Sequence, residues 1–179
     1  PTVNKDLLRE WIDYKFNLNK SKDVIYKIED LLTNSITKKD ELFYKILLAQ
    51  SYINLDDYIA SSNILNELLN ENSTSTVFKN EFSEIYYLLA KINLLESKYI
   101  EAQDNYQLSI DASRTSEYGK KSKNKIEALI DYTNFLEEIK YLGLNDKNII
   151  DESLFIENSK LDSLFFHAGQ LLYFDLDRK

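Results

Sequence analysis

A chain of 179 residues is long enough for one domain or for about four helical hairpins in a row. Its 44% hydrophobic and 29% charged residues are typical of a globular protein, and 3 Gly with 1 Pro are too few breakers for a β-sandwich or barrel. The absence of cysteine excludes disulfides and thiolate metal sites, and a formal net charge of −8 argues against nucleic-acid binding, which needs a basic surface. The composition therefore predicts an all-α fold.

Apolar residues three or four apart predict six helices in the first two thirds of the chain. Leu8 and Ile12 belong to such a stripe in the first helix, and Val24 and Ile28 belong to one in the second. In chain order, these helices are predicted at residues 5–16, 24–32, 41–55, 57–69, 77–95 and 98–112. The links between them are short and polar, so successive helices should pair as hairpins.

The polar stretch 113–123, which contains Gly119, is predicted to be a loop. A seventh helix should follow from about 124 to 141. It should end at Gly143, because glycine readily takes the left-handed conformation of a helix C-cap.

Asn145 or Asp146 should then cap an eighth helix that starts near Lys147. The remainder, to about Phe174, should hold one long helix or two short ones. No domain boundary interrupts the array, so residues 1–179 are predicted to form a single helical-repeat domain.

The most informative pattern is an internal repeat with a step of 41 residues. Leu-Leu-Ala at 47–49 recurs at 88–90, and Tyr-Ile at 58–59 recurs at 99–100. A step between 20 and 50 residues is typical of stacked-repeat proteins. One helical hairpin cannot bury its apolar stripe alone, so such units pack on one another.

Each copy resembles the tetratricopeptide repeat (TPR) family. In that family the first helix carries a small residue, and the second opens on an aromatic, then has a small and later a large residue. These positions hold Ala49, Tyr58, Ser61 and Leu65, and then Ala90, Tyr99, Ala102 and Tyr106. The resemblance covers repeats 39–70 and 79–112, with a drifted hairpin at 5–33 and a drifted hairpin or cap at 124–175. It implies a right-handed α-solenoid of stacked antiparallel helical hairpins, with about eight helices and units longer than the family's basic 34 residues.

The resemblance also implies that first helices line a groove for an extended peptide or a partner helix. Positions three before, one after and four after the small residue should face inward. With Ile12, Ala49, Ala90 and Thr133 at the small position, the inward residues are Arg9, Asp13 and Phe16; Ile46, Gln50 and Ile53; Tyr87, Lys91 and Leu94; and Ile130, Asn134 and Glu137. The residues at these positions do not match the family's lysine- and asparagine-based clamp for chaperone C-termini.

The sequence gives little support for a catalytic or metal-binding site. His167 is the only histidine and lies in an apolar segment, so we expect a packed or interface residue rather than a base or ligand. Adjacent acidic residues point in different directions on a helix, and no calcium loop or glycine-rich phosphate loop occurs. We therefore expect no enzyme activity, no metal and no cofactor.

Aromatic and aliphatic residues crowd the C-terminal segment. They either close the last hairpin, which we favour, or form an exposed patch that docks a partner. The candidate interface residues for the second case are Phe165, Phe166 and Tyr173.

The leading hypothesis is a non-catalytic protein–protein interaction scaffold, and the acidic net charge favours a basic partner. The alternatives are a peptide-sensing regulatory domain of a larger protein and a structural segment of a large helical assembly. The lack of any methionine suggests an excised or processed fragment. With no apolar run of 18 residues and a charged N-terminus, we expect no membrane span and no signal peptide, and therefore a cytoplasmic location.

Overall fold

The computed structural model describes residues 4–34, 37–72, 77–145 and 153–176. Its helices in chain order are α1 (Lys5–Asn17), α2 (Ser21–Leu32), α3 (Lys38–Ile53), α4 (Tyr58–Glu71), α5 (Lys79–Leu95), α6 (Tyr99–Ala112), α7 (Glu117–Asn145) and α8 (Ser153–Gln170), followed by a π-helical segment, η1 (Leu171–Asp175). No strand occurs in these ranges. The eight α-helices confirm the predicted all-α class.

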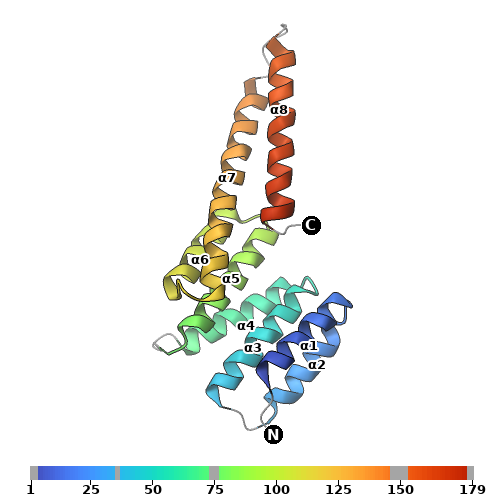
Figure 1. The fold of residues 1–179 in the computed structure, drawn as a ribbon, viewed down its shortest axis with the longest axis vertical. Helices are drawn as coiled ribbons and strands as arrows, with labels where there is room; N and C mark the ends of the chain where they lie inside the picture. The colour runs from blue at the N-terminus through green and yellow to red at the C-terminus, as the bar shows by residue number, and fades with distance from the viewer. Residues whose placement is uncertain (1–3, 35–36, 73–76, 146–152, 177–179) are drawn as a thin grey trace.

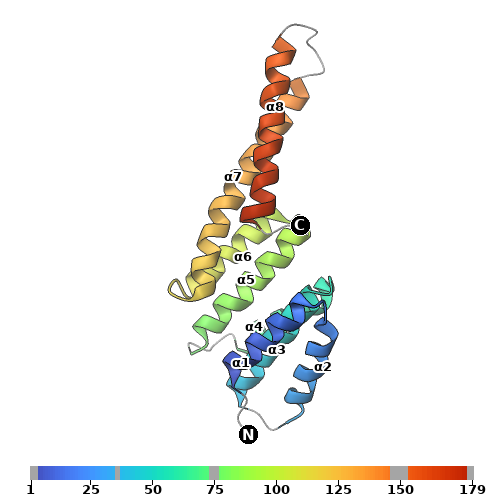
Figure 2. The same ribbon diagram turned by 45° about the vertical axis from the view of Figure 1, so that its right-hand side comes forward.

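The helices pair in chain order into four hairpins, and each hairpin contacts the next (Figure 1). Consecutive hairpins meet through α2 and α3, through α3 and α4 with α5, and through α5 and α6 with α7. The α7–α8 hairpin projects along the long axis of the molecule, away from α1–α4 (Figure 2). The C-terminal end of α8 and the residue after η1 return to α5 and α6, where Ala168 and Leu176 join the core around Ala90 and Ala102.

The first three hairpins close with the same turn. In each turn one residue has a positive φ angle: Asn19 (54°), Asp56 (58°) and Ser97 (63°). The N–H of the following residue donates to a carbonyl five positions earlier: Lys20 to Lys15 (2.9 Å), Asp57 to Tyr52 (3.0 Å) and Lys98 to Asn93 (2.8 Å). This is the Schellman pattern of a helix C-terminus. The drifted first hairpin therefore ends its first helix in the same way as the two clear copies.

The small positions of the repeat lie where helices approach one another closely. Ala49 and Ala90 in the first helices of their units have no exposed surface. Ser61 and Ala102 in the second helices are likewise fully buried. A larger side chain at these positions would force the helix axes apart, because interiors are close-packed.

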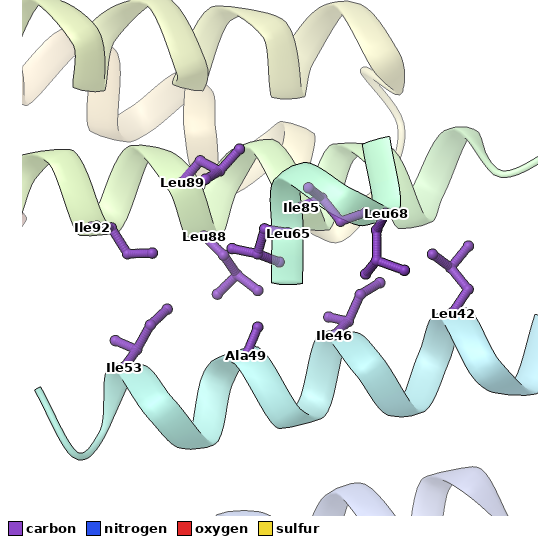
Figure 3. Close-up of a cluster of buried hydrophobic side chains, with 10 residues drawn as sticks. All are labelled: Leu42, Ile46, Ala49, Ile53, Leu65, Leu68, Ile85, Leu88, Leu89 and Ile92. Carbon is purple, nitrogen blue, oxygen red and sulfur yellow. The ribbon is translucent and has the colours of Figure 1, made fainter. Parts of the chain in front are cut away.

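Figure 3 shows one of the resulting cores, between α3 and α5. Ile53 of α3 points toward Ile92 of α5, and Ile46 points toward Leu68 of α4, with Ala49 between them on α3. Leu65 and Leu68 of α4 complete the cluster. Burying each such leucine or isoleucine contributes about 1.5–3 kcal/mol to stability, so hairpin-to-hairpin packing holds the array together.

The predicted loop at 113–123 is wrong in its second half, because α7 begins inside it. Ser116 caps the helix: its Oγ accepts a hydrogen bond from the Gly119 N–H (3.0 Å) and donates one to the Ser113 carbonyl (2.8 Å). Ser113 and Ser116 therefore cap the N-terminus of α7. As a result, the first turns of α7 are brought against the preceding hairpins.

The other end of α7 also differs from the prediction. Gly143 lies within the helix, which continues to Asn145, so it is not the predicted left-handed C-cap. The predicted helix start near Lys147 and the alternative cap Asp146 lie outside the described residues. α8 begins at Ser153 and runs directly into η1.

Candidate functional site

Two adjoining hollows lie between α1, α3, α5 and the first turns of α7. Their shared lining residues are Asp13, Gln50, Tyr118 and Lys121. The first hollow, of about 240 Å³, is also lined by Phe16, Ile53, Asn54, Tyr87, Leu88 and Lys91. The second, of about 460 Å³, is also lined by Asp6, Arg9, Ile12, Leu47 and Glu117. We refer to the two together as the inter-hairpin cleft.

A third hollow, of about 250 Å³, adjoins the cleft at Arg9, Glu117 and Tyr118, which line both. Its other walls come from α3, from the N-terminal half of α5 and from the cap of α7. These residues are Phe43, Ile46, Asn80, Glu81, Glu84 and Ser116. We call this space the side hollow.

A bidentate ion pair lies where the cleft meets the side hollow. Arg9 Nη1 and Nη2 donate to the two carboxylate oxygens of Glu84 at 3.1 and 3.0 Å. Gln50 Nε2 donates to the same carboxylate at 3.3 Å. The side chain of Glu84 is only 6% exposed, whereas that of Arg9 is 34% exposed. One buried carboxylate thus links α1, α3 and α5.

Tyr118 of α7 completes this cluster. Burial and the adjacent Glu84 carboxylate raise the pKa of the Tyr118 phenol above its ordinary value. The phenol therefore stays protonated and donates a hydrogen bond to Glu84. Burial alone would lower the pKa of Arg9, but the charge and hydrogen bonds of Glu84 and Tyr118 together raise it. Arg9 is therefore charged at neutral pH.

Helical spacing explains why these side chains meet. Arg9 and Asp13 are four residues apart on α1, so they share a face, while Leu8 and Ile12 turn the adjacent face into the core. On α5, Glu84, Tyr87 and Lys91 lie on one face, because they are three and four residues apart. The cleft is therefore assembled from one face of each first helix.

On α7, Glu117 and Lys121 form an ion pair one helical turn apart, with Lys121 Nζ 2.7 Å from the Glu117 carboxylate. The hydrogen bond and charge of Lys121 lower the pKa of Glu117. Tyr118 lies between them and contacts the ring of Tyr87, at 5.3 Å between centroids. The first two turns of α7 thereby supply both charged and aromatic groups to the cleft.

Of the twelve predicted inward residues, the structure brings seven together. Those that line the inter-hairpin cleft are Arg9, Asp13, Phe16, Gln50, Ile53, Tyr87 and Lys91. Ile46 is only 1% exposed and belongs to the core, so it reaches only the side hollow. Ile130 and Asn134 line none of the three hollows. The reason is that α7 starts earlier than predicted and meets the cleft with its first turns.

Sequence reasoning missed seven charged or aromatic residues of the site, which are Asp6, Phe43, Glu81, Glu84, Glu117, Tyr118 and Lys121. A signal for Glu84 does exist in the repeat. The position six before the small residue holds Asp6, Phe43 and Glu84 in three successive units, and all three line the cleft or the side hollow. Extending the inward register by one turn would have found it. The residues of α7 were missed because their segment was predicted to be a loop.

Acidic groups outnumber basic ones around the three hollows. The carboxylates are Asp6, Asp13, Glu81, Glu84 and Glu117, and the cations are Arg9, Lys91 and Lys121. Arg9 is paired with Glu84 and Lys121 with Glu117. Within the described residues, Asp6, Asp13 and Glu81 form no ion pair. The potential in the cleft therefore favours a cationic ligand.

The aromatic C-terminal segment has two faces. Leu164 and Ala168 are buried, and η1 packs onto α7, so one face closes the hairpin as favoured from the sequence. The candidate interface residues lie on the exposed face: Phe165 is 55%, Phe166 64% and Tyr173 56% exposed. Closure and an exposed aromatic surface are therefore both present.

We expect Phe166→Asp to leave the fold intact, with a loss of less than about 0.5 kcal/mol in the free energy of unfolding, because the side chain is mostly exposed. Leu164→Ala, on the buried face two residues earlier, should cost about 2 kcal/mol. Urea unfolding followed by circular dichroism measures both. A large loss for Phe166→Asp would show that this face is buried in the protein in solution.

His167 is exposed, so of the two expected roles it is not a packed core residue, and the interface role stays a prediction. Its ring stacks on Phe135 of α7 at 6.0 Å between centroids, and Nδ1 lies 2.7 Å from the Ser163 carbonyl. That distance makes Nδ1 the protonated nitrogen and donor. The carbonyl orients the ring along its own helix, and among the described residues no acidic side chain pairs with it.

In the parts of the chain that the structure describes, no three histidine or acidic side chains are placed to hold a metal ion. None of the described helices is both long and apolar enough to cross a membrane. Comparison with protein-family models, curated protein sequences and solved structures finds no match for this chain.

Proposed function

We propose that this chain is a TPR-like binding module that holds an extended, basic peptide in the inter-hairpin cleft and catalyses no reaction. In this proposal the four hairpins stack as a right-handed solenoid, and α1, α3, α5 and α7 are the binding helices. The observation that carries it is the convergence of side chains from all four of these helices on one cleft.

The lining of the cleft suits peptide recognition. Gln50 and Asn54 carry amide groups that can pair with a peptide backbone, which needs both donors and acceptors. Tyr87 and Phe16 offer aromatic surface to apolar side chains. The two adjoining hollows make an extended ligand a better fit than a single small molecule.

The charge around the cleft supports a basic ligand. Asp6 and Asp13 of α1 line the cleft, and Glu81 of α5 lines the side hollow. Lysine or arginine side chains spaced along a peptide can approach all three carboxylates. Exposed charge pairs of this kind contribute about 0.5 kcal/mol each.

The test is binding of peptides from a random-sequence array, measured by fluorescence anisotropy at low salt. We expect the bound sequences to be enriched in lysine and arginine. Asp6→Asn/Asp13→Asn/Glu81→Gln should then weaken binding about tenfold, because three lost pairs amount to roughly 1.5 kcal/mol. The difference should shrink as salt is added.

The matched control is Glu29→Gln/Asp104→Asn/Asp131→Asn. It removes the same number of negative charges from exposed positions that line none of the three hollows. We expect it to bind nearly as well as the unmodified chain. Equal weakening by both triple variants, or no enrichment in basic residues, would contradict binding in the cleft.

A further inference from the structure

The guanidinium of Arg9 makes more contacts than the cation of an ordinary surface ion pair. Both of its terminal nitrogens donate to Glu84, at 3.1 and 3.0 Å. Its carbon lies 4.8 Å from the centroid of the Phe43 ring, over the ring face. Tyr118 hydrogen-bonds into the same cluster. A carboxylate fork, an aromatic face and a phenol therefore surround one planar cation.

These three groups come from helices other than that of Arg9. Glu84 lies on α5, Phe43 on α3 and Tyr118 on α7, and Gln50 of α3 orients the carboxylate from the side. Glu84 is 5% exposed and Phe43 is 9% exposed, so packing fixes both of them. The three groups around the guanidinium thus come from helices other than α1, although Leu8 and Ile12 of α1 pack in the same core as Phe43 and Lys5 Nζ lies 4.9 Å from the centroid of its ring.

Arg9 itself is the more exposed partner and reaches the pocket as a single side chain. α1 is held independently, because Leu8 and Ile12 pack into the first core and Lys5 pairs with Asp40 of α3 at 2.6 Å. Arg9 also lies between the cleft and the side hollow, and it lines both. Withdrawal of Arg9 would join the two spaces and open Glu84 to a ligand without unfolding α1.

We propose that Glu84, Phe43 and Tyr118 form a guanidinium-binding site, which Arg9 occupies in the free protein and which an arginine of a bound peptide takes over. The second part of this proposal rests on the proposed function. Arginine is favoured over lysine because only the planar fork can donate to both carboxylate oxygens and stack on the ring. Asp13 lines the cleft and Glu81 lines the side hollow, so each of the two spaces that Arg9 adjoins has a carboxylate that forms no ion pair within the described residues.

The test uses N-methylguanidinium as the probe on the full chain carrying Arg9→Ala. We expect saturable binding in the millimolar range, seen as a rise of about 3 °C in the melting temperature at roughly ten times the dissociation constant. Methylammonium, which has the same charge and no fork, should raise it far less. The unmodified chain, whose site is filled, and Arg9→Ala/Glu84→Gln, which lacks the carboxylate, should show no saturable rise.

Should Arg9→Ala be unfolded, the probe must restore its helical circular dichroism, and methylammonium must not. Arg9→Gln is the second variant. The glutamine amide is uncharged and leaves most of the space beside the Glu84 carboxylate free for the probe. An absence of rescue in both variants, or equal rescue by the two cations, would overturn the guanidinium site. Because the rescue needs no peptide, its failure leaves binding in the cleft standing. A failure of the peptide titrations would overturn the cleft proposal and leave the guanidinium site standing.

Discussion

Gly119→Ala should lower the free energy of unfolding by about 2–4 kcal/mol, although alanine is normally the better helix former. Gly119 is in the first turn of α7, and a Cβ atom built on it would overlap the Ser113 carbonyl oxygen. That oxygen is backbone and also accepts a hydrogen bond from Ser116, so it cannot move aside cheaply. The substitution must shift the cap of α7 or break it.

The matched control is Gly169→Ala in α8, where an added Cβ atom meets nothing within 4 Å. There the usual helix preference should apply, and the variant should be more stable by about 0.5–1 kcal/mol. Urea unfolding of the two variants side by side gives both values. If Gly119→Ala were as stable as Gly169→Ala, the cap at Ser116 could not have this geometry.

The periodic part of the fold could be predicted from the sequence. Ala49 and Ala90, identified by their 41-residue spacing, are fully buried at equivalent places in successive hairpins. The same register places Gln50 and Lys91 in the cleft. Such positions can be predicted from the sequence because each is determined by contacts inside one hairpin or with the next hairpin.

The start of α7 could not be read in this way. The polar stretch at 113–123 has no apolar stripe, so local pattern favours a loop. Tertiary contacts make the second half of this stretch helical. The Ser116 hydroxyl lies 2.8 Å from Ser83 Oγ of α5, and Gly119 lets the chain pass close to Ser113. A contact between residues 33 positions apart leaves no local signal. Because the start of α7 was predicted too late in the chain, the groove positions on this helix were assigned to Ile130 and Asn134 rather than to residues of its first turns.

The bidentate pair escaped prediction for a different reason. Arg9 was expected in the groove, but its partner Glu84 is 75 positions away and lies one turn outside the inward positions that we considered. Acidic residues are common in this chain, so nothing local distinguishes Glu84 from the others. Only the fold shows that this carboxylate is buried and that Arg9 compensates its charge.

That compensation leads to the second large effect. Arg9→Ala should lower the free energy of unfolding by about 2–4 kcal/mol, because it leaves the buried carboxylate of Glu84 without its cation. The lower end of the range applies if water enters through the gap left by Arg9, whose side chain is one third exposed. Lys27→Ala removes the exposed i,i+3 ion pair with Asp30 and should cost less than about 0.5 kcal/mol, which makes it the matched control.

A double-mutant cycle separates this charge effect from lost packing. Glu84→Gln keeps the shape of the side chain and removes the charge that Arg9 compensates. In the Arg9→Ala/Glu84→Gln variant no buried charge remains unpaired, so it should be more stable than Arg9→Ala alone by about 1–2 kcal/mol. Losses that simply add would mean that the two side chains do not interact in solution. Recovery of stability on removal of the second charge would instead show that Arg9 stabilises the fold by occupying the Glu84 site, which a guanidinium supplied from outside could do in its place.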